Sequence, residues 1–263
     1  MTDRAPIRLG IWQDETPTGG VDAVLARIAE ALHKAESAGV NLLVFPECFL
    51  TGYYRAAEDV PLAADAVTPE VMTRLDALAD DTGIGFVVGS YEQREDGVRN
   101  AAHVFLPDAS HGTTYCKRAL YGDWEKEAFA QGKSPCLFEY MGYRFGVLIC
   151  FDVEFPELVR EAAKAGADAV LVPTALMEPD HWIADFVVQS RAVENGITVV
   201  YANRIGREGH LTFLGKSQIC DPLAQSREVA PEGHCGLIHA PLAQPELPAD
   251  YIAEITEQRL PSI

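Results

Sequence analysis

Apolar residues recur along this chain in two alternating patterns. Short uninterrupted apolar runs, such as 41–45 and 147–149, contain β-branched residues and indicate buried strands. Longer segments, such as 21–38, repeat their apolar residues every three or four positions, which is typical of amphipathic helices. Strands that alternate with helices predict a layered α/β fold.

The predicted elements cover most of the chain. Strands are predicted over 7–12, 41–45, 84–91, 100–106, a short segment ending at Lys117, 137–140, 143–149, 169–172, 198–202, 216–220 and 236–239. Helices are predicted over 21–38, 69–79, from Pro156 to about Gly166, and over 180–195. Segment 49–63 is predicted to be a loop with room for a short helix, and the tail after Pro241 to pack on the surface or on a partner chain. No linker-like segment or repeat interrupts this order, so we expect one domain over residues 1–263.

Composition narrows the classes of function. A hydrophobic content of 48% supports a packed core rather than disorder. The net charge of -18 argues against nucleic acid or an anionic membrane as a partner, and it fits a solvated acidic surface or a small cationic ligand. The N-terminus lacks the apolar core of a signal peptide, and no apolar run has the length of a membrane span. We therefore expect a cytoplasmic protein.

The six cysteines are scattered and form no Cys-x-x-Cys pair. A chain of this length needs no disulfide staples, so we expect reduced thiols. His234 and His239 flank Cys235 too loosely to make a zinc signature.

Cys150 lies where a predicted strand gives way to the turn before a predicted helix. Side chains at such turns are exposed at the edge of a sheet, which makes this thiol a candidate nucleophile. The alternative is a buried structural cysteine, the commonest role of a free thiol. Two further predicted strands end in Glu47 and Lys117, and functional groups in layered α/β folds gather at strand ends. Taken singly, Glu47 also fits a turn carboxylate and Lys117 a surface charge.

Three segments carry a family resemblance. They are Phe45-Pro-Glu-Cys-Phe-Leu-Thr-Gly-Tyr53, Tyr115-Cys-Lys-Arg-Ala-Leu120 and Leu148-Ile-Cys-Phe-Asp-Val-Glu-Phe-Pro-Glu157. With these segments the chain resembles the carbon–nitrogen hydrolases of the nitrilase superfamily, from about residue 7 to about residue 239. The resemblance implies a four-layer α-β-β-α sandwich of two mixed sheets, a Glu47–Lys117–Cys150 triad, no metal or cofactor, and assembly through helices into homodimers or larger oligomers.

The same resemblance implies a second glutamate near the nucleophile. Glu125 falls at that place, with Asp123 and Glu127 as alternatives. Glu125 would hold Lys117 or the substrate nitrogen in place.

These residue types suit thiol chemistry. A free cysteine titrates near pH 8.5, so Glu47 would take its proton, while Lys117 and a helix N-terminus would favour the thiolate. Lys117 and the backbone N–H of Phe151 would donate to the oxyanion that forms on an amide, each worth about 3 kcal/mol.

Substrate candidates come from the neighbourhood of the nucleophile. Segments 150–157, 172–177 and 201–203 resemble the aliphatic amidases that act on amino-substituted amides, such as aminopentanamidase. Glu154 would then bind a substrate ammonium, or else form a structural salt bridge with Arg160 or Arg191. The predicted pocket-lining residues are Tyr53, Trp124, Phe151 and Ala175.

Three positions depart from the family pattern. The family often has a basic residue at position 116 and histidine at 119, where this chain has Cys116 and Ala119, and the amidase branch usually has tyrosine where this chain has Phe151. The wall beside Lys117 has therefore changed. Alternative functions are an N-carbamoyl amine hydrolase, a nitrile-cleaving enzyme, a non-catalytic binding relative, and a redox-sensing thiol protein with Cys48 or Cys116 as the resolving cysteine.

Overall fold

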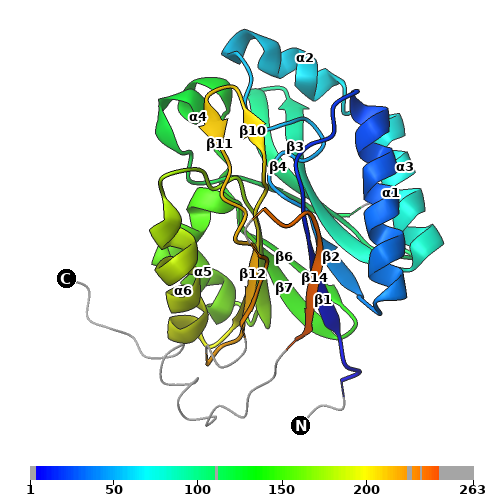
Figure 1. Cartoon of the computed structure of the whole chain (residues 1–263), viewed down its shortest axis with the longest axis vertical. Coiled ribbons are helices and arrows are strands. Elements are labelled where there is room, and N and C mark those ends of the chain that lie inside the picture. The colour runs from blue at the N-terminus through cyan, green and yellow to red at the C-terminus, as the bar shows by residue number, and fades with distance from the viewer. Residues whose placement is uncertain (1–3, 110–111, 224–226, 232, 243–263) are drawn as a thin grey trace.

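The structure, a computed structural model, describes residues 4–109, 112–223, 227–231 and 233–242. Two β-sheets pack face to face, and helices cover the outer face of each sheet (Figure 1). This arrangement confirms the predicted four-layer α-β-β-α sandwich. The predicted packing of the tail after Pro241 falls almost wholly outside the described residues.

The first sheet has the strand order β14-β1-β2-β3-β4-β5. Strands β1, β2 and β3 run parallel, and the remaining neighbours pair antiparallel. Its strands are β1 (Arg8–Gln13), β2 (Leu42–Val44), β3 (Gly85–Arg94), β4 (Gly97–Phe105), β5 (Thr114–Cys116) and β14 (Gly236–Pro241).

The second sheet has the order β13-β12-β9-β8-β7-β6, again with a parallel centre, formed by β7, β8 and β9. Its strands are β6 (Cys136–Tyr140), β7 (Tyr143–Val147), β8 (Ala169–Pro173), β9 (Thr198–Ala202), β12 (Gln218–Cys220) and β13 (Arg227–Val229). A separate two-stranded ribbon pairs β10 (Arg207–Glu208) with β11 (Leu211–Thr212).

The long helices lie where the apolar periodicity places them. Helices α1 (Val21–Ser37) and α3 (Pro69–Thr82) cover the first sheet, and α5 (Pro156–Lys164) and α6 (Val188–Asn195) cover the second (Figure 1). Helix α1 buries one apolar stripe, which packs against the sheet because removing apolar surface from water is favourable. Its buried residues are Val24, Leu25, Ile28, Ala31, Leu32 and Ala35.

Several short elements differ from the sequence prediction. The short helix allowed for in 49–63 is present as the 3₁₀ helix η1 (Ala57–Asp59) and helix α2 (Val60–Asp65), which extends two residues further. Helix α4 (Gly122–Ala128), in contrast, lies where none was predicted. The predicted helix 180–195 begins with a π-helical turn, η3 (Ile183–Val187), before α6. Strands β10, β11 and β13 were also missed, because each has only two or three residues and none of them forms an apolar run.

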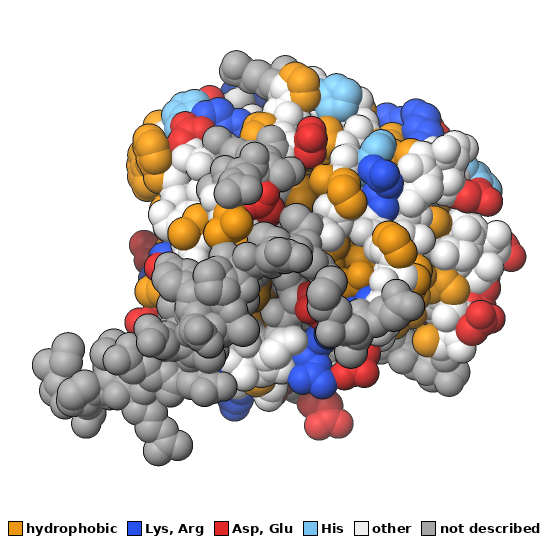
Figure 2. Space-filling view, turned by 90° about the horizontal axis from the view of Figure 1, so that it is seen from below, with side chains coloured by type: hydrophobic (Ala, Val, Ile, Leu, Met, Phe, Trp, Pro, Cys, Tyr) orange, Lys and Arg blue, Asp and Glu red, His pale blue; other side chains and the backbone are white. Residues whose placement is uncertain are grey.

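Charged residues lie mainly on the outside. On the face in Figure 2, acidic, basic and hydrophobic side chains lie in small interspersed groups rather than in one patch of a single kind. Among the described residues, no helix combines the length and the apolar character needed to cross a bilayer.

Candidate active site

Three strand ends bring the candidate residues to one place. Glu47 follows β2, Lys117 follows β5, and Cys150 follows β7. The backbone N–H of Glu47 donates to the carbonyl of Thr174, which follows β8, at 3.3 Å. This bond joins the loop of the first sheet to the second sheet, so the candidate site lies between them.

The Cys150 turn has an unusual backbone. Cys150 has φ 45°, in the left-handed region that non-glycine residues rarely adopt. It also opens the 3₁₀ helix η2 (Cys150–Glu154), and the α-helix that follows begins only at Pro156. The predicted position between strand and helix is confirmed, with a 3₁₀ turn between the thiol and the α-helix.

Asp152 ties the Cys150 turn to the Lys117 segment. Its buried carboxylate accepts hydrogen bonds from the N–H of Ile149 (3.0 Å) and from the Tyr115 hydroxyl (2.7 Å). Its other oxygen accepts from the N–H of Ala119 (2.7 Å) and, at 3.2 Å, from that of Arg118. A buried carboxylate with every donor in place fixes the two segments relative to each other.

Lys117 lies between two buried carboxylates. Its Nζ donates to Oε1 of Glu47 at 2.8 Å and to Oε1 of Glu125 at 2.7 Å, and all three side chains are fully buried. Asp123 and Glu127, the alternatives to Glu125, are exposed. The structure therefore places Glu125, and neither neighbour, beside Lys117.

Neutral donors orient the two carboxylates. Asn100 Nδ2 donates to Oε1 of Glu47 at 2.7 Å, and the Tyr53 hydroxyl donates to Oε1 of Glu125 at 2.8 Å. The N–H of Tyr121 donates to the other oxygen of Glu125 at 2.7 Å. Oε2 of Glu47 is buried and has no hydrogen bond among the described residues. One carboxylate oxygen of Glu47 is thus left for other chemistry.

Burial and charge shift the pKa values of this cluster. Burial alone would lower the pKa of Lys117, but the charges of Glu125 and Glu47 outweigh burial and raise that pKa well above its ordinary value. Burial raises the pKa of Glu47 although Lys117 opposes the rise. Both carboxylates therefore favour the ammonium form of Lys117 in the folded chain.

The pKa of the Cys150 thiol is also raised, by burial and by the negative charge of Glu47. Lys117 and a hydrogen bond from the backbone N–H of Ala175 act in the opposite direction but do not prevail. The effect of Lys117 on the pKa of the thiol therefore has the predicted direction, and the effect of a helix N-terminus stays a prediction. Cys150 rests as a thiol and needs a base to release its proton.

The predicted pocket-lining residues lie around this cluster. The rings of Tyr53 and Trp124 pack with centroids 5.3 Å apart, and Trp124 Nε1 donates to the carbonyl of Arg55 at 2.9 Å. Phe151 packs edge-on against Tyr121, with centroids 5.2 Å apart. Ala175 contributes its backbone N–H to the sulfur in addition to a small buried side chain.

Glu154 makes neither of the predicted salt bridges. Arg191 donates to the backbone carbonyls of Val153 and Glu154, both at 2.8 Å, and pairs through Nη1 with Glu194. Among the described residues, no hydrogen bond or ion pair involves the carboxylate of Glu154. This half-buried side chain has its pKa raised to about 7, by burial and by the charge of Asp180.

The cysteines proposed as resolving partners lie in protected surroundings. Burial raises the pKa of Cys48 well above its ordinary value and that of Cys116 to about 11.

Within the described part of the chain, no group of three or more His, Cys, Asp and Glu residues is arranged to hold a metal ion.

Sequence reasoning assigned no role to Asn100, Asp152 or Tyr121. The sequence gives a weak indication of a role for two of them. Asn100 is a polar residue within a buried strand, and Asp152 is a carboxylate two residues after Cys150 in an apolar segment. Tyr121 acts through its backbone N–H, which every residue except proline has, so sequence holds no signal for it.

A thiol that feels the charge of a buried carboxylate, on a fold of two packed sheets, is the arrangement that a cysteine-dependent hydrolase needs. The chain matches the family model "Carbon-nitrogen hydrolase" over residues 8–247. A Pseudomonas protegens protein described as the hydrolase in the pqqF 5′ region is 37% identical over 197 residues, covering 73% of this chain and 69% of that protein. An (R)-stereoselective amidase from Pseudomonas sp. is 30% identical over 186 residues, covering 70% of this chain and 67% of that protein.

Solved structures agree with these relatives. A double mutant of the Nesterenkonia sp. amidase in complex with acrylamide has a TM-score of 0.84 and 30% identity, covering 98% of this chain and 96% of that chain. In another mutant of that amidase, with a TM-score of 0.78 and 32% identity and covering 96% and 94% of the two chains, the acetamide moiety of fluoroacetamide is covalently added at the active-site cysteine. The chain belongs to the carbon–nitrogen hydrolase family of the nitrilase superfamily. It is a thiol-dependent carbon–nitrogen hydrolase.

Proposed function

We propose that Glu47, Lys117 and Cys150 are the catalytic triad, with Cys150 as the nucleophile and Glu125 as a fourth catalytic residue. The observation that carries this proposal is that the two carboxylate oxygens of Glu47 have different surroundings. One oxygen binds Lys117 and Asn100, and the other is buried and free of hydrogen bonds, while the carboxylate charge acts on the Cys150 thiol. The raised pKa of Glu47 suits a general base.

The first half of the reaction forms a thioester. Glu47 takes the Cys150 proton as the sulfur attacks the amide carbonyl carbon, and the carbonyl oxygen becomes an oxyanion. An ammonium has three N–H groups, and Lys117 uses two on Glu47 and Glu125, so one remains for the oxyanion. The backbone N–H of Phe151 is the second donor, and each donor is worth about 3 kcal/mol.

The second half releases both products. Glu47 gives its proton to the leaving nitrogen as the C–N bond breaks, and ammonia departs. Glu47 then takes a proton from water, which attacks the thioester carbon. The C–S bond breaks, the carboxylic acid leaves, and Glu47 returns the proton to the Cys150 sulfur, which restores the thiol and the base. Glu125 keeps Lys117 charged and in place throughout.

The proposed substrate is a small linear amide that bears an amino group. The half-buried carboxylate of Glu154, without an ion pair among the described residues and close enough to Asp180 for their charges to interact, is suited to bind an ammonium. The Nesterenkonia amidase, solved with acrylamide, supports a small amide. Tyr53, Trp124, Phe151 and Ala175 would line the rest of the pocket.

A panel of three substrates tests this assignment. An aminoalkyl amide, its N-carbamoyl analogue and the corresponding nitrile are each incubated with the enzyme, and ammonia is measured. We expect the amide to have the highest kcat/KM. A preference for the carbamoyl compound would replace the proposal with an N-carbamoyl amine hydrolase, and a preference for the nitrile would replace it with a nitrile-cleaving enzyme.

A labelling experiment tests the nucleophile directly. Iodoacetamide at neutral pH should label Cys150 stoichiometrically, and an amide substrate should slow this labelling. Labelling of another cysteine at the same rate, or no protection by substrate, would contradict the assignment of Cys150.

A further inference from the structure

We propose that Glu208 is a positioning residue of the active site, which acts through the backbone of Tyr53 and Tyr54 to hold the Tyr53 hydroxyl on Glu125. This inference rests on the proposed roles of Glu125 and Lys117. Glu208 lies in the β10–β11 ribbon, outside both sheets and far along the chain from each catalytic residue.

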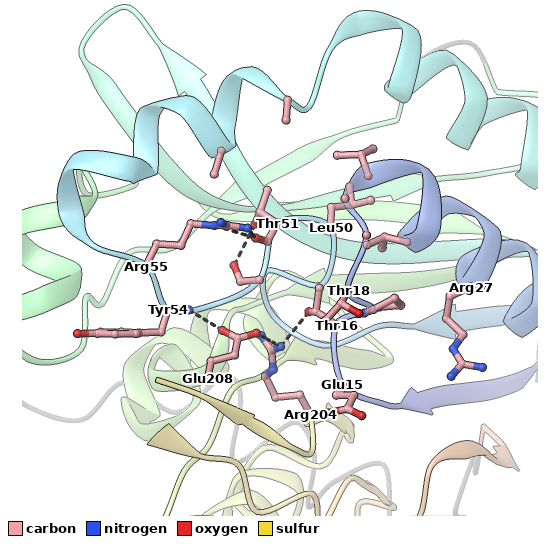
Figure 3. A pocket seen from close by; sticks show the side chains of 18 of the residues that line it. Glu15, Thr16, Thr18, Arg27, Leu50, Thr51, Tyr54, Arg55, Arg204 and Glu208 are labelled. Carbon is pink, nitrogen blue, oxygen red and sulfur yellow. Dashed lines mark hydrogen bonds and ion pairs between the residues drawn. The ribbon is translucent and has the colours of Figure 1, made fainter. Parts of the chain in front are cut away.

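The carboxylate of Glu208 binds two consecutive backbone N–H groups. Its Oε2 accepts from the N–H of Tyr53 at 2.8 Å and from that of Tyr54 at 2.7 Å. Figure 3 shows Glu208 between Tyr54 and Arg204, with dashed lines to both. The carboxylate of Glu208 therefore holds the backbone of Tyr53 and Tyr54 in one position.

Arg204 anchors Glu208 from below. Its Nη2 forms an ion pair with Oε1 of Glu208 and donates to Oγ1 of Thr16 at 2.8 Å. The guanidinium is only 1% exposed and lies over the Phe213 ring, 4.5 Å from the ring centroid. A buried charge with these contacts has little freedom to move, so Glu208 is held in one position.

Tyr53 is fixed along its whole length. Its N–H binds Glu208, its carbonyl accepts from the Tyr91 hydroxyl at 2.6 Å, and its ring packs edge-on against Phe213 with centroids 5.9 Å apart. Its hydroxyl then donates to Oε1 of Glu125, the oxygen that also accepts from Lys117. A displaced Tyr53 backbone would therefore move a hydrogen bond of Glu125.

One side of this loop borders a cavity, although Tyr53 itself is buried in a hydrophobic cluster. This cavity of about 910 Å³ is lined among others by Thr51, Gly52, Tyr54 and Glu208 (Figure 3). Gly52 has φ 79°, a backbone conformation that glycine adopts without strain. The hydrogen bonds to Glu208 therefore hold the backbone on the side that faces the cavity, in addition to the packing of the Tyr53 ring.

A double-mutant cycle tests the inference. Glu208→Gln keeps an acceptor for the two N–H groups but breaks the ion pair with Arg204, and Tyr53→Phe removes only the hydroxyl. The matched control is Asp168→Asn, because Asp168 also binds an arginine (Arg4, 2.8 Å) and a backbone N–H (Arg144, 2.8 Å), but does so away from the site. Activity is measured as ammonia release from an amide, and folding by circular dichroism.

We expect Glu208→Gln and Tyr53→Phe each to lower kcat about tenfold with little change in KM, because both act on groups that bind the transition state. The double mutant should lose about as much as Tyr53→Phe alone, since the Tyr53 hydroxyl transmits the effect. Asp168→Asn should keep wild-type kcat.

Two results would overturn the inference. One is a double mutant whose loss is the product of the two single losses, and the other is wild-type kcat for Glu208→Gln. If Glu208→Gln does not fold, Arg204→Lys takes its place in the cycle, since it keeps a cation beside Glu208 but changes how the carboxylate is held. Neither result touches the proposed triad, which instead fails if Cys150→Ala retains activity.

Discussion

At the scale of single residues, the two oxygens of Glu47 give the sharpest prediction. Glu47→Gln keeps the side-chain shape but removes the base, so kcat should fall about 10³-fold. Cys150→Ala removes the nucleophile and should abolish hydrolysis. Ammonia release gives the activities, and circular dichroism shows whether both variants are folded. Hydrolysis by folded Cys150→Ala above the background rate would rule out the proposed mechanism.

Glu154 predicts a pH dependence that is specific to cationic substrates. Burial, helped by Asp180, raises its pKa to about 7, so the carboxylate is charged above this pH and neutral below it. KM for an aminoalkyl amide should therefore fall as the pH rises through about 7 and increase as the pH falls below it. The substrate ammonium itself titrates near pH 10 and stays charged over this range.

The control for this prediction is a neutral alkyl amide of equal length. Its KM should not change over the same pH range, and Glu154→Gln should remove the pH dependence for the cationic substrate. An equal change of KM for both amides in the wild-type enzyme would show that Glu154 does not bind an ammonium.

At the scale of elements, β3 supports the Glu47 loop through a glycine. A Cβ on Gly89 would lie 2.3 Å from the backbone N of Cys48 and 2.8 Å from the carbonyl O of Pro46. Only glycine permits this approach, because no real side chain tolerates backbone atoms so close. The position of the loop, and therefore of Glu47, depends on residue 89 having no Cβ.

Gly89→Ala should therefore displace Glu47 and lower kcat/KM by at least about tenfold. Gly85→Ala in the same strand is the matched control, because its Cβ would meet only side-chain atoms, the nearest 3.0 Å away on Leu106, and these have room to adjust. The two variants are compared by ammonia release and by thermal unfolding. Similar losses of activity in both would show that β3 affects the site only through stability.

Element prediction succeeded where a pattern is long enough to repeat. Helix α1 extends over 17 residues and shows its apolar stripe several times, whereas α4 has seven residues and buries Glu125 on its inner side. A hydrophobicity pattern assigns a glutamate to the surface. The buried side of α4 therefore could not be recognised from the sequence, and the helix was missed. The π-helical turn at 183–187 keeps a helix-like pattern and differs only in its hydrogen bonds.

At the scale of the whole molecule, the helices that cover the second sheet expose large apolar side chains. Phe186, in η3, is 69% exposed, and Trp182, just before η3, is 50% exposed. The segment η3 leads directly into α6, which covers the outer face of the second sheet (Figure 1). Exposed aromatic residues of this size are enriched at protein–protein interfaces. We propose that this surface joins two copies of the chain in a homodimer or larger oligomer.

Light scattering after size exclusion checks this proposal. The wild-type protein should have the mass of a dimer or more, and Phe186→Glu should shift it toward the monomer, since a charge at an interface core costs binding energy. Leu62→Glu is the matched control, because Leu62 is 73% exposed on α2, far along the chain from this surface. A wild-type monomer, or equal dissociation by both variants, would reject the interface.

The sequence by itself determined the layered α/β class, the long elements and the family, because each depends on local periodicity or on short motifs. The single domain and the cytoplasmic location stay predictions. Only the tertiary structure decided how Glu47, Lys117 and Glu125 share hydrogen bonds, because these residues are separated along the chain and meet only in the folded protein. It also decided the pKa of Cys150, because burial and the charge of Glu47 exist only once the two sheets have packed.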